Sequence, residues 1–442
     1  MSDILKKDNK FIQEYVSNII PGISGLLGKR PEMYLPGGMW PTYYSKAKGI
    51  QIWDLKGREY LDFTMLGIGS CALGYADEEI NNVAKSIIDS GSLTTLNSPE
   101  DIELAELLLE FHPWAEQVKY ARSGGEIMSM AVRLARASTG RDKILVCGYH
   151  GWHDWYLSAN LSSDKNLNSH LLPGLQPLGV PKALLDTVIP FRFNSCEDFK
   201  NIVEKHSHEA AAIIIEPARD KVVCSKFLAG IRRVANQKNC VLIFDEVTCA
   251  WRHQTSGIHM ELGVSPDLAA FGKTMANGIP MAALIGKKSI MEKSLHTFIS
   301  STNWTERLGP ACSLAFLKKH KRINLGKILI ENGNKIRKIW QKAASGNNID
   351  IQISGIIPLS SFKIDHEKWP FIITFFIQEM LKKGILASDR CYANSCQSDK
   401  YLSLYEEACN EVFLKISKFL NEDNIEKKLD GSVKQMGFYR LT

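Results

Sequence analysis

Residues 118–147 read VKYARSGGEIMSMAVRLARASTGRDKILVC, and this stretch decides the fold class. Two short apolar runs, 118–121 and 144–147, enclose a helical pattern over 126–138 in which apolar side chains recur at helical spacing. Gly140 follows that pattern, as glycine does at the C-terminal end of many helices. The runs do not alternate polar and apolar residues, which is typical of parallel strands covered on both faces. The stretch therefore predicts a strand–helix–strand unit of an α/β domain.

The same alternation extends on both sides of this unit. Further apolar strands are predicted at 211–215, 240–244 and 268–271, and helices at 98–109 and 227–237. These elements place a large α/β domain over residues 66–312.

The two ends of the chain have a different pattern. After residue 312 helices dominate, at 313–319, 328–344 and 401–420, with a few short strands. Near the N-terminus, residues 49–63 have the pattern of a β-hairpin. We therefore expect a smaller α+β domain over 313–442, which the segment 1–65 with its hairpin joins.

Composition excludes several classes of protein. The 442 residues include 54 Lys and Arg and 48 Asp and Glu, so the net charge is only +6. The basic residues are scattered along the chain and are not interleaved with aromatic residues. Nucleic acid is therefore not an expected partner. No uncharged apolar run approaches the ~20 residues of a membrane span, and the polar N-terminus is not a secretory signal. Ten dispersed cysteines without a Cys-x-x-Cys pair favour a reduced, cytoplasmic compartment.

A first candidate site is the sequence Ser123-Gly124-Gly125-Glu126, between a strand and a helix. Ser123 and Glu126 have the spacing of a capping box. The two glycines allow a ligand to approach the backbone, and the free N–H groups of a helix N-terminus attract anions. A phosphate site and a simple capped helix both fit this pattern.

Two further candidates follow neighbouring strands. Asp245 ends the strand CVLIFD, where an acid serves as a cofactor partner, a metal ligand or a helix cap. Lys273 follows the strand LAAF and is either a surface lysine or an amine that forms a Schiff base with a carbonyl. Gly-Lys-Thr at 272–274 is not a P-loop, because that motif needs glycine at position 267, which is Asp.

An aromatic side chain completes the set. Tyr149 lies just past the strand ILVC, in Tyr-His-Gly-Trp-His, where it can stack on a flat ring. The glycine between His150 and His153 favours a loop over a helical metal-binding pair, and no metal is expected. A phosphate site, a carboxylate, a lysine and an aromatic ring are the groups that pyridoxal 5′-phosphate (PLP) requires.

Four passages together resemble the class III (ω-type) PLP-dependent aminotransferases, most closely the branch of glutamate-1-semialdehyde 2,1-aminomutase. The resemblance covers about residues 49–317. The passages are GIQIWDLKGREYLDF; RSGGEIMSMAVRLARASTGRDKIL with YHGWHD; IIIEP with VLIFDEV; and PDLAAFGKTMANGIPMAALIG. The resemblance implies fold type I, with a mostly parallel seven-stranded sheet covered by helices in a large domain and a small α+β domain.

The resemblance also implies roles for individual residues. Lys273 would hold PLP as an internal aldimine and move protons, and Asp245 would pair with the pyridine nitrogen. Tyr149 and Val247 would pack on the two faces of the ring, and Glu216 would lie near its hydroxyl group. The phosphate would be held by Ser123, Gly124 and Gly125. Thr302 would contact the phosphate bound in the neighbouring subunit. The last contact implies a homodimer with shared active sites.

Several positions depart from the family pattern. Gly125 stands where the family usually has Thr or Ser, and Glu216-Pro217 is followed by Ala-Arg-Asp. MWPTYY at 39–44 and STNWTERLGP at 301–310 replace loops that help to shape the aminomutase's substrate site. Within or near these loops we expect a substrate-binding wall; its candidates are Trp40, Trp152, Trp304 and Arg307.

Three functions remain open at this point. The leading one is an intermolecular aminotransferase, which takes an amino group from a small-molecule donor, forms pyridoxamine phosphate and passes the group to a ketone or aldehyde. The second is the aminomutase, which moves the group within one carbon skeleton. The third is a non-catalytic relative, which the departures at Gly125 and after Pro217 favour but the presence of both Asp245 and Lys273 opposes.

Overall fold

The computed structural model describes residues 3–170 and 173–437 and divides into two compact units. The large unit comprises residues 78–327 with 437, and the small unit comprises residues 3–77 with 328–436. The predicted domain limits after residues 65 and 312 both lie earlier along the chain than these boundaries.

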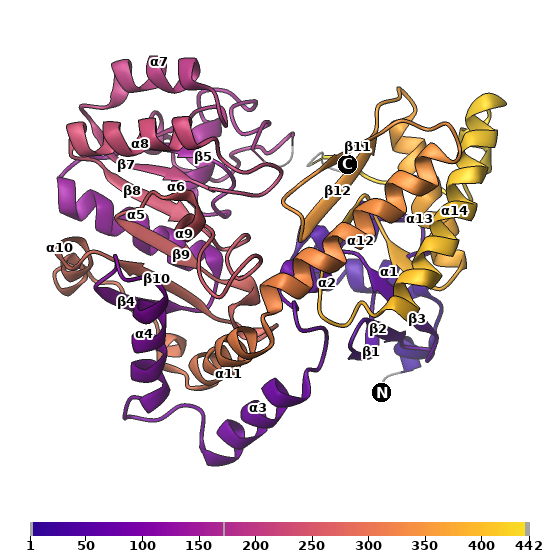
Figure 1. Ribbon diagram of the computed structural model, residues 1–442, viewed down its shortest axis with the longest axis horizontal. Helices are drawn as coiled ribbons and strands as arrows, with labels where there is room; N and C mark the ends of the chain where they lie inside the picture. The colour runs from indigo at the N-terminus through magenta and orange to yellow at the C-terminus, as the bar shows by residue number, and fades with distance from the viewer. Residues whose placement is uncertain (1–2, 171–172, 438–442) are drawn as a thin grey trace. The chain divides into compact units, whose positions relative to one another are not determined.

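The large unit is built on a seven-stranded sheet (Figure 1). Its strands, in spatial order, are β4 (Gln117–Ala121), β10 (Ala282–Gly286), β9 (Leu268–Phe271), β8 (Val241–Asp245), β7 (Ala210–Ile215), β5 (Lys143–Cys147) and β6 (Val188–Pro190). β10 is antiparallel to both of its neighbours, and all the other pairs are parallel. The predicted α/β fold with a mostly parallel sheet is confirmed.

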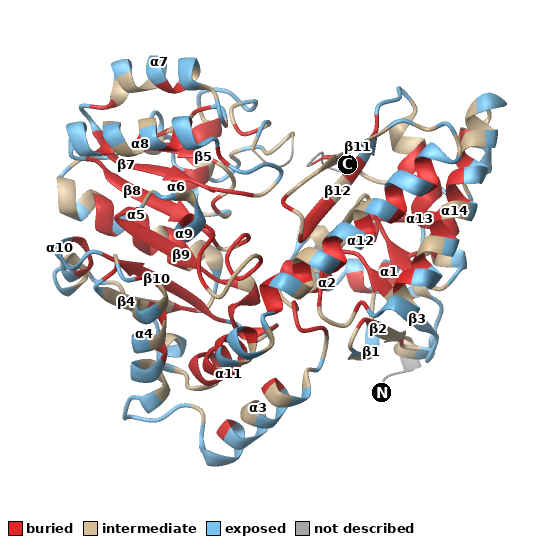
Figure 2. Ribbon diagram, viewed as in Figure 1, coloured by how far each residue is buried: buried red, intermediate tan, exposed pale blue. Residues whose placement is uncertain are grey.

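Helices cover this sheet because its strands have no polar face. Every residue of β7, β8 and β9 is buried, as the red strands in Figure 2 show. α5 (Gly124–Thr139) packs on β7, β8, β9 and β10 through Ile127, Met130 and Leu134, and α8 (Ser225–Lys238) packs on β7 and β8. The other helices of the large unit are α3 (Glu78–Ser90), α4 (Pro99–Phe111), α6 (Asp154–Leu157), α7 (Cys196–His206), α9 (His259–Leu262), α10 (Lys288–Met291) and α11 (Leu308–Ile323).

The position of α11 explains where the large unit ends. The helical pattern after residue 312 suggested a new domain, but α11 packs against α3 and α4 of the large unit. The next helix, α12 (Leu325–Ser345), carries the chain into the small unit.

The small unit has its own core and two sheets. The order β1 (Tyr44–Lys48), β2 (Gln51–Asp54), β3 (Glu59–Phe63), β13 (Ile385–Ala387) includes the predicted hairpin, and β11 (Ile351–Ser354), β12 (Leu359–Ile364) and β14 (Arg390–Tyr392) form the second sheet. The helices are α1 (Asn9–Ser17), α2 (Leu66–Gly69), part of α12, α13 (Trp369–Lys382) and α14 (Asp399–Asn421). Residues from α12, α13 and α14 share one buried cluster with Tyr60 and Phe63 of β3.

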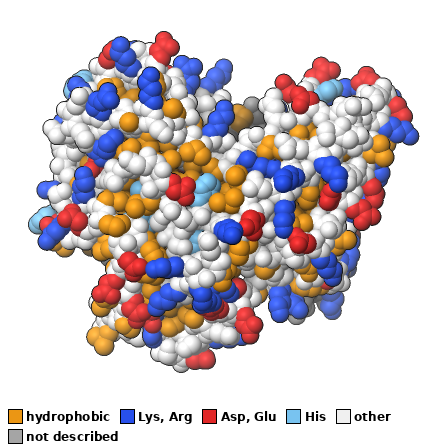
Figure 3. Space-filling model, viewed as in Figure 1, with side chains coloured by type: hydrophobic (Ala, Val, Ile, Leu, Met, Phe, Trp, Pro, Cys, Tyr) orange, Lys and Arg blue, Asp and Glu red, His pale blue; other side chains and the backbone are white. Residues whose placement is uncertain are grey.

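The charged side chains, the cysteines and the helices can be compared with what the composition indicated. Acidic and basic side chains are interspersed on the face shown in Figure 3, without one large basic field. All ten cysteines carry free thiols. Within residues 3–170 and 173–437, no helix has both the length and the apolar character needed to cross a membrane.

Candidate active site

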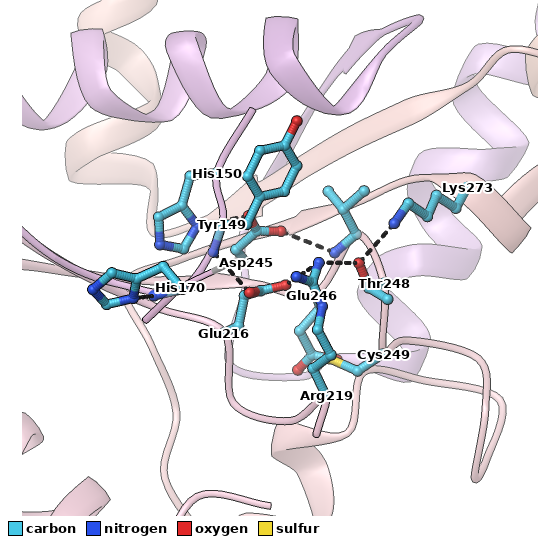
Figure 4. Close-up of polar contacts among 12 residues, drawn as sticks. Tyr149, His150, His170, Glu216, Arg219, Asp245, Glu246, Thr248, Cys249 and Lys273 are labelled. Atoms are coloured by element: carbon cyan, nitrogen blue, oxygen red, sulfur yellow. Dashed lines mark hydrogen bonds and ion pairs between the residues drawn. The ribbon is translucent and has the colours of Figure 1, made fainter. Parts of the chain in front are cut away.

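Four strand ends bring the polar candidates of the large unit together. Asp245 is the last residue of β8, and Lys273 comes two positions after the end of β9. Glu216 follows β7 directly, and Tyr149 comes two positions after β5. Because β5, β7, β8 and β9 are parallel neighbours, their carboxyl ends lie at one edge of the sheet. Figure 4 shows the resulting cluster.

Lys273 is held in an unusual conformation with an unusual proton affinity. Its φ of 46° lies in the left-handed region, which costs a non-glycine residue about 1 kcal/mol. Its Nζ donates to Oγ1 of Thr248 at 2.9 Å. Burial, followed by the positive charge of Arg219, lowers the pKa of the Lys273 amine to about 8. A larger share of this amine is therefore neutral near pH 7 than of a lysine in water.

Asp245 is buried and held by two donors. Nδ1 of His150 lies 2.8 Å from Oδ2, and the backbone N–H of Val247 donates to Oδ1 at 3.1 Å. His150 is fully buried, and its Nε2 has no hydrogen-bond partner among the described residues. An ionised Asp245 requires the His150 proton to be on Nδ1. This contact was not predicted from the sequence, although His150 directly follows Tyr149 at a neighbouring strand end.

Glu216 forms an ion pair with Arg219 that was not predicted from the sequence. Its Oε1 lies 2.8 Å from Arg219, and its Oε2 accepts the backbone N–H of Tyr149 at 2.8 Å. Arg219 also donates to Oγ1 of Thr248 at 3.2 Å, and its guanidinium lies 5.9 Å from the centre of the Tyr149 ring. Burial raises the pKa of the Glu216 carboxyl, and Arg219 opposes that shift. The Ala-Arg-Asp sequence after Glu216-Pro217, which departs from the expected family pattern, is the feature from which Arg219 could have been singled out.

Thr248 is the junction of these contacts. Figure 4 shows Lys273 and Arg219 reaching its hydroxyl from different sides. A single hydroxyl oxygen therefore separates a lysine amine from a guanidinium, and their mutual repulsion favours the neutral form of the amine.

The N-terminus of α5 has the predicted cap. Oγ of Ser123 accepts the backbone N–H of Glu126 at 3.4 Å and donates to Oε2 of the same residue at 3.0 Å. Among the described residues, the backbone N–H groups of Gly124 and Gly125 have no acceptor. A Cβ at Gly124 would lie 3.1 Å from Cγ1 of Val247, so the helix start and the strand-end loop approach closely. The free N–H groups leave a place for an anion.

The segment that follows β10 contributes residues with partners inside the large unit. Nε1 of Trp304 donates to Oε1 of Glu126 at 3.2 Å. Arg307 donates twice to Glu100, each time at 2.8 Å, so a contact from Arg307 to substrate would require this ion pair to open. Thr302 is exposed in a short 3-10 helix (η8, Thr302–Thr305).

Trp40 and Trp152 are the remaining substrate candidates, and each is described within its own unit. Trp40 belongs to the small unit, where it is buried and stacks on Tyr34 with the ring centres 4.2 Å apart. Trp152 is 70% exposed and touches the ring of His153 edge-on.

A cavity of about 620 Å³ lies along α5 beside its N-terminal turn. Its lining includes Glu126, Ser129, Arg133, His153, Trp155 and Trp304. It is therefore adjacent to the helix start, and its lining does not include Lys273 or Asp245.

A family model described as "Aminotransferase class-III" matches residues 36–420, most of the chain. The chain belongs to the class III aminotransferases. The resemblance found in the sequence is thereby confirmed at the level of the family. The expectation of an enzyme with PLP as its cofactor is confirmed at the same level.

Curated relatives support this assignment over nearly the full length. The aminotransferase is 28% identical over 421 residues to 3-aminobutyryl-CoA aminotransferase of Cloacimonas acidaminovorans (strain Evry), which covers 92% of this chain and 97% of that protein. It is 30% identical over 331 residues to 2′-deamino-2′-hydroxyneamine transaminase of Streptomyces kanamyceticus, and this match covers 75% of this chain and 79% of that protein.

Solved structures share the fold. The FumI protein of Sphingopyxis sp. MTA144, solved in its PLP internal aldimine form, superposes with a TM-score of 0.83 at 21% identity and covers 93% of this chain and 97% of that one. A glutamate-1-semialdehyde aminomutase of Pseudomonas aeruginosa PAO1 gives a TM-score of 0.74 at 18% identity, and the match covers 86% of this chain and 89% of that one. The comparisons do not single out the aminomutase branch, and membership in that branch stays a prediction.

Proposed function

We propose that this aminotransferase binds PLP at the carboxyl edge of its seven-stranded sheet and transfers an amino group from a small-molecule donor to a ketone or aldehyde acceptor. The observation that carries the proposal is the meeting of Lys273, Asp245 and the start of α5 around one strand edge. The residues fit the cofactor: a lysine with a lowered pKa suits its aldehyde, a buried carboxylate suits its ring nitrogen, and free helix N–H groups suit its phosphate.

Bound PLP supplies an aldehyde that takes up amino groups and a ring that withdraws electrons. Lys273 is the residue that would hold it covalently. Because the pKa of its amine is lowered to about 8, Nζ can accept and return a proton near neutral pH. Thr248 orients that nitrogen through its hydroxyl.

Asp245 would hold the ring nitrogen in its protonated form. Its two oxygens already accept from His150 and from the backbone of Val247, and these contacts fix the orientation of the carboxyl group. His150 therefore acts through Asp245 as a positioning residue. Tyr149 and Val247 would contact the two faces of the ring, and Glu216, held by Arg219, would lie on its hydroxyl side.

The phosphate would be held at the start of α5 by Ser123, Gly124 and Gly125. The backbone N–H groups of the two glycines serve this role without competition, whereas the hydroxyl of Ser123 is already engaged with Glu126. Thr302 of the partner subunit would complete the site in a homodimer.

Intermolecular transfer is favoured over the aminomutase reaction by the two curated relatives, whose names describe an aminotransferase and a transaminase. The segment that carries Trp304 and Arg307 also differs from the aminomutase loop at the same place. We expect Trp304 to border the cofactor site, since its indole is bound to the helix that starts there.

The test is to trap the cofactor link chemically. Purified protein incubated with PLP and then with borohydride should carry a stable PLP group on the peptide that contains Lys273, as determined by mass spectrometry. Lys273→Ala should lose this label and the visible chromophore, whereas the exposed control Lys226→Ala should keep both. A label on another lysine, or a wild-type protein that forms no chromophore, would overturn the proposal.

A further inference from the structure

The aminotransferase has glycine at position 125, where the resemblance described above led us to expect Thr or Ser, so the first turn of α5 offers no side-chain donor at this position. The structure shows what occupies the vacant space. A Cβ at Gly125 would lie 3.0 Å from Nε2 of His153 and 3.3 Å from Cδ2 of the same ring. An imidazole therefore lies beside the helix start where the missing side chain would have pointed.

A row of hydrogen bonds fixes which nitrogen of His153 carries the proton. Nε1 of Trp155 donates to Oγ of Ser129 at 3.1 Å, and that oxygen contacts Nδ1 of His153. Indole nitrogen is only a donor, so one lone pair of the Ser129 hydroxyl is taken. Within the described part of the chain, the hydroxyl proton has one acceptor, Nδ1 of His153. If Ser129 donates its hydroxyl proton to Nδ1 of His153, both the indole N–H of Trp155 and the hydroxyl of Ser129 have an acceptor. Nδ1 is then unprotonated, so the imidazole proton is on Nε2.

The Nε2–H group of His153 is free to bind a ligand. Among residues 3–170 and 173–437 it has no hydrogen-bond partner. The nearby carboxylate of Glu126 accepts from Arg122, Ser123 and Trp304, and no hydrogen bond joins it to His153 in the described part of the chain. Burial lowers the pKa of His153, so the ring is neutral near pH 7 and the tautomer argument applies.

We propose that His153 is a further cofactor-binding residue, whose Nε2–H donates to the phosphate of PLP at the N-terminus of α5 and replaces the side-chain donor that Gly125 lacks. Trp155 and Ser129 are its positioning residues. The phosphate then meets three free donors from this chain, the backbone N–H groups of Gly124 and Gly125 and the imidazole. This inference rests on the proposed function, since it assumes that PLP occupies the strand edge.

The experiment compares two aldehydes that differ in the phosphate. Protein freed of cofactor is titrated with PLP and with pyridoxal, and each dissociation constant is determined from the change in protein fluorescence. His153→Ala should weaken PLP binding about tenfold, as expected for one hydrogen bond to a charged group, and leave pyridoxal binding unchanged. The exposed control His208→Ala should change neither.

A reciprocal exchange separates a lost contact from a damaged fold. Gly125→Thr alone should weaken PLP binding, because its Cβ would crowd the imidazole at 3.0 Å. In the His153→Ala background the same threonine should restore much of the lost affinity, since space and a hydroxyl donor are then both present. Ser129→Ala should give an intermediate loss, because Nδ1 loses the donor that fixes the tautomer.

Three outcomes have distinct meanings. Equal losses for PLP and pyridoxal in His153→Ala, or no loss for either, would overturn the role of His153. Failure of Gly125→Thr to restore affinity in His153→Ala would also contradict it. If the wild-type protein itself shows no borohydride-stable PLP on Lys273, the proposed function fails instead, so the two failures are distinguishable.

Discussion

The amine of Lys273 has an environment that can be tested residue by residue. Its pKa is lowered to about 8 by burial first and then by Arg219, which reaches the same hydroxyl of Thr248. Because the folded pKa lies below the usual value near 10.5, the neutral amine appears as the pH rises through about 8 rather than above 10.

We therefore expect the rate at which PLP attaches to cofactor-free protein to rise with pH around a midpoint near 8. Arg219→Met removes a positive charge beside the amine, so its midpoint should shift to higher pH, whereas Arg219→Lys keeps the charge and should stay near the wild type. Stopped-flow absorbance at a series of pH values measures both midpoints. A midpoint in Arg219→Met that equals or falls below the wild-type value would contradict the electrostatic role of Arg219.

The lowered pKa of Lys273 also makes the stability of the folded protein depend on pH. Between pH 8 and about 10.5 the unfolded chain binds more protons at Lys273 than the folded protein does, so this residue makes the cofactor-free protein more stable as the pH rises over that window. Below pH 8 the buried amine must be charged in the folded state and its effect is unfavourable.

At the scale of elements, α5 ends as its sequence predicts. Gly140 has φ of 67° and its N–H donates to the carbonyl oxygen of Arg136 at 2.9 Å, which closes the last turn in the left-handed conformation. No atom lies within 4 Å of a Cβ at this position, so a substitution adds backbone strain without a steric clash.

Gly140→Ala should therefore lower the free energy of unfolding by about 1 kcal/mol, and Gly140→Asn by less, since asparagine tolerates this conformation better than alanine. Urea unfolding of the holoenzyme, followed by circular dichroism, measures the difference. An alanine variant as stable as the wild type would show that the helix end relaxes to another conformation.

Some helices and strands could be predicted from their local sequence, and others could not. The strand at 268–271 was predicted with the bounds that β9 has, because four apolar residues lie between Asp267 and Gly272. The helix start at Ser123 was indicated by its capping box and is observed. By contrast, β6 has only three residues, and three residues carry too little periodicity to be recognised.

At the scale of the whole molecule, the large unit exposes apolar side chains that a monomer would leave in water. Phe298 is 90% exposed, and Leu96 and Leu295 are exposed by 80% and 77%. We take these three residues as candidates for the surface that a second subunit covers in the proposed homodimer. They lie in the large unit that also carries Thr302, the residue proposed to reach the neighbouring site.

We expect the protein to behave as a dimer of twice 49.6 kDa in light scattering coupled to gel filtration. Leu96→Asp combined with Phe298→Asp should shift it to the monomer and weaken PLP binding, because Thr302 of the partner subunit would be lost. Ile19→Asp, which changes an exposed apolar residue of the small unit, should leave the dimer intact. A wild-type monomer that binds PLP tightly would contradict the shared site.

The domain limits and the surroundings of the substrate candidates both depend on packing that a local sequence pattern does not contain. The change of pattern after residue 312 marks a helix, α11, and only its packing on α3 and α4 assigns that helix to the large unit. Trp40 and Arg307 were grouped because aromatic and basic residues lie in altered loops. The structure gives Trp40 a stacking partner six positions earlier, Tyr34, and gives Arg307 an ion pair with Glu100, 207 positions away.

The sequence by itself determined the fold class and the family, and it indicated the three main candidate positions Ser123, Asp245 and Lys273, because local periodicity, turn residues and strand ends are properties of short segments. The tertiary structure alone decided which side chains meet. His150 reaches Asp245 across 95 residues, Arg219 reaches Thr248 across 29, and His153 lies over Gly125. These contacts depend on side-chain direction and on the order of strands in the sheet, and neither is written in any short stretch of the chain.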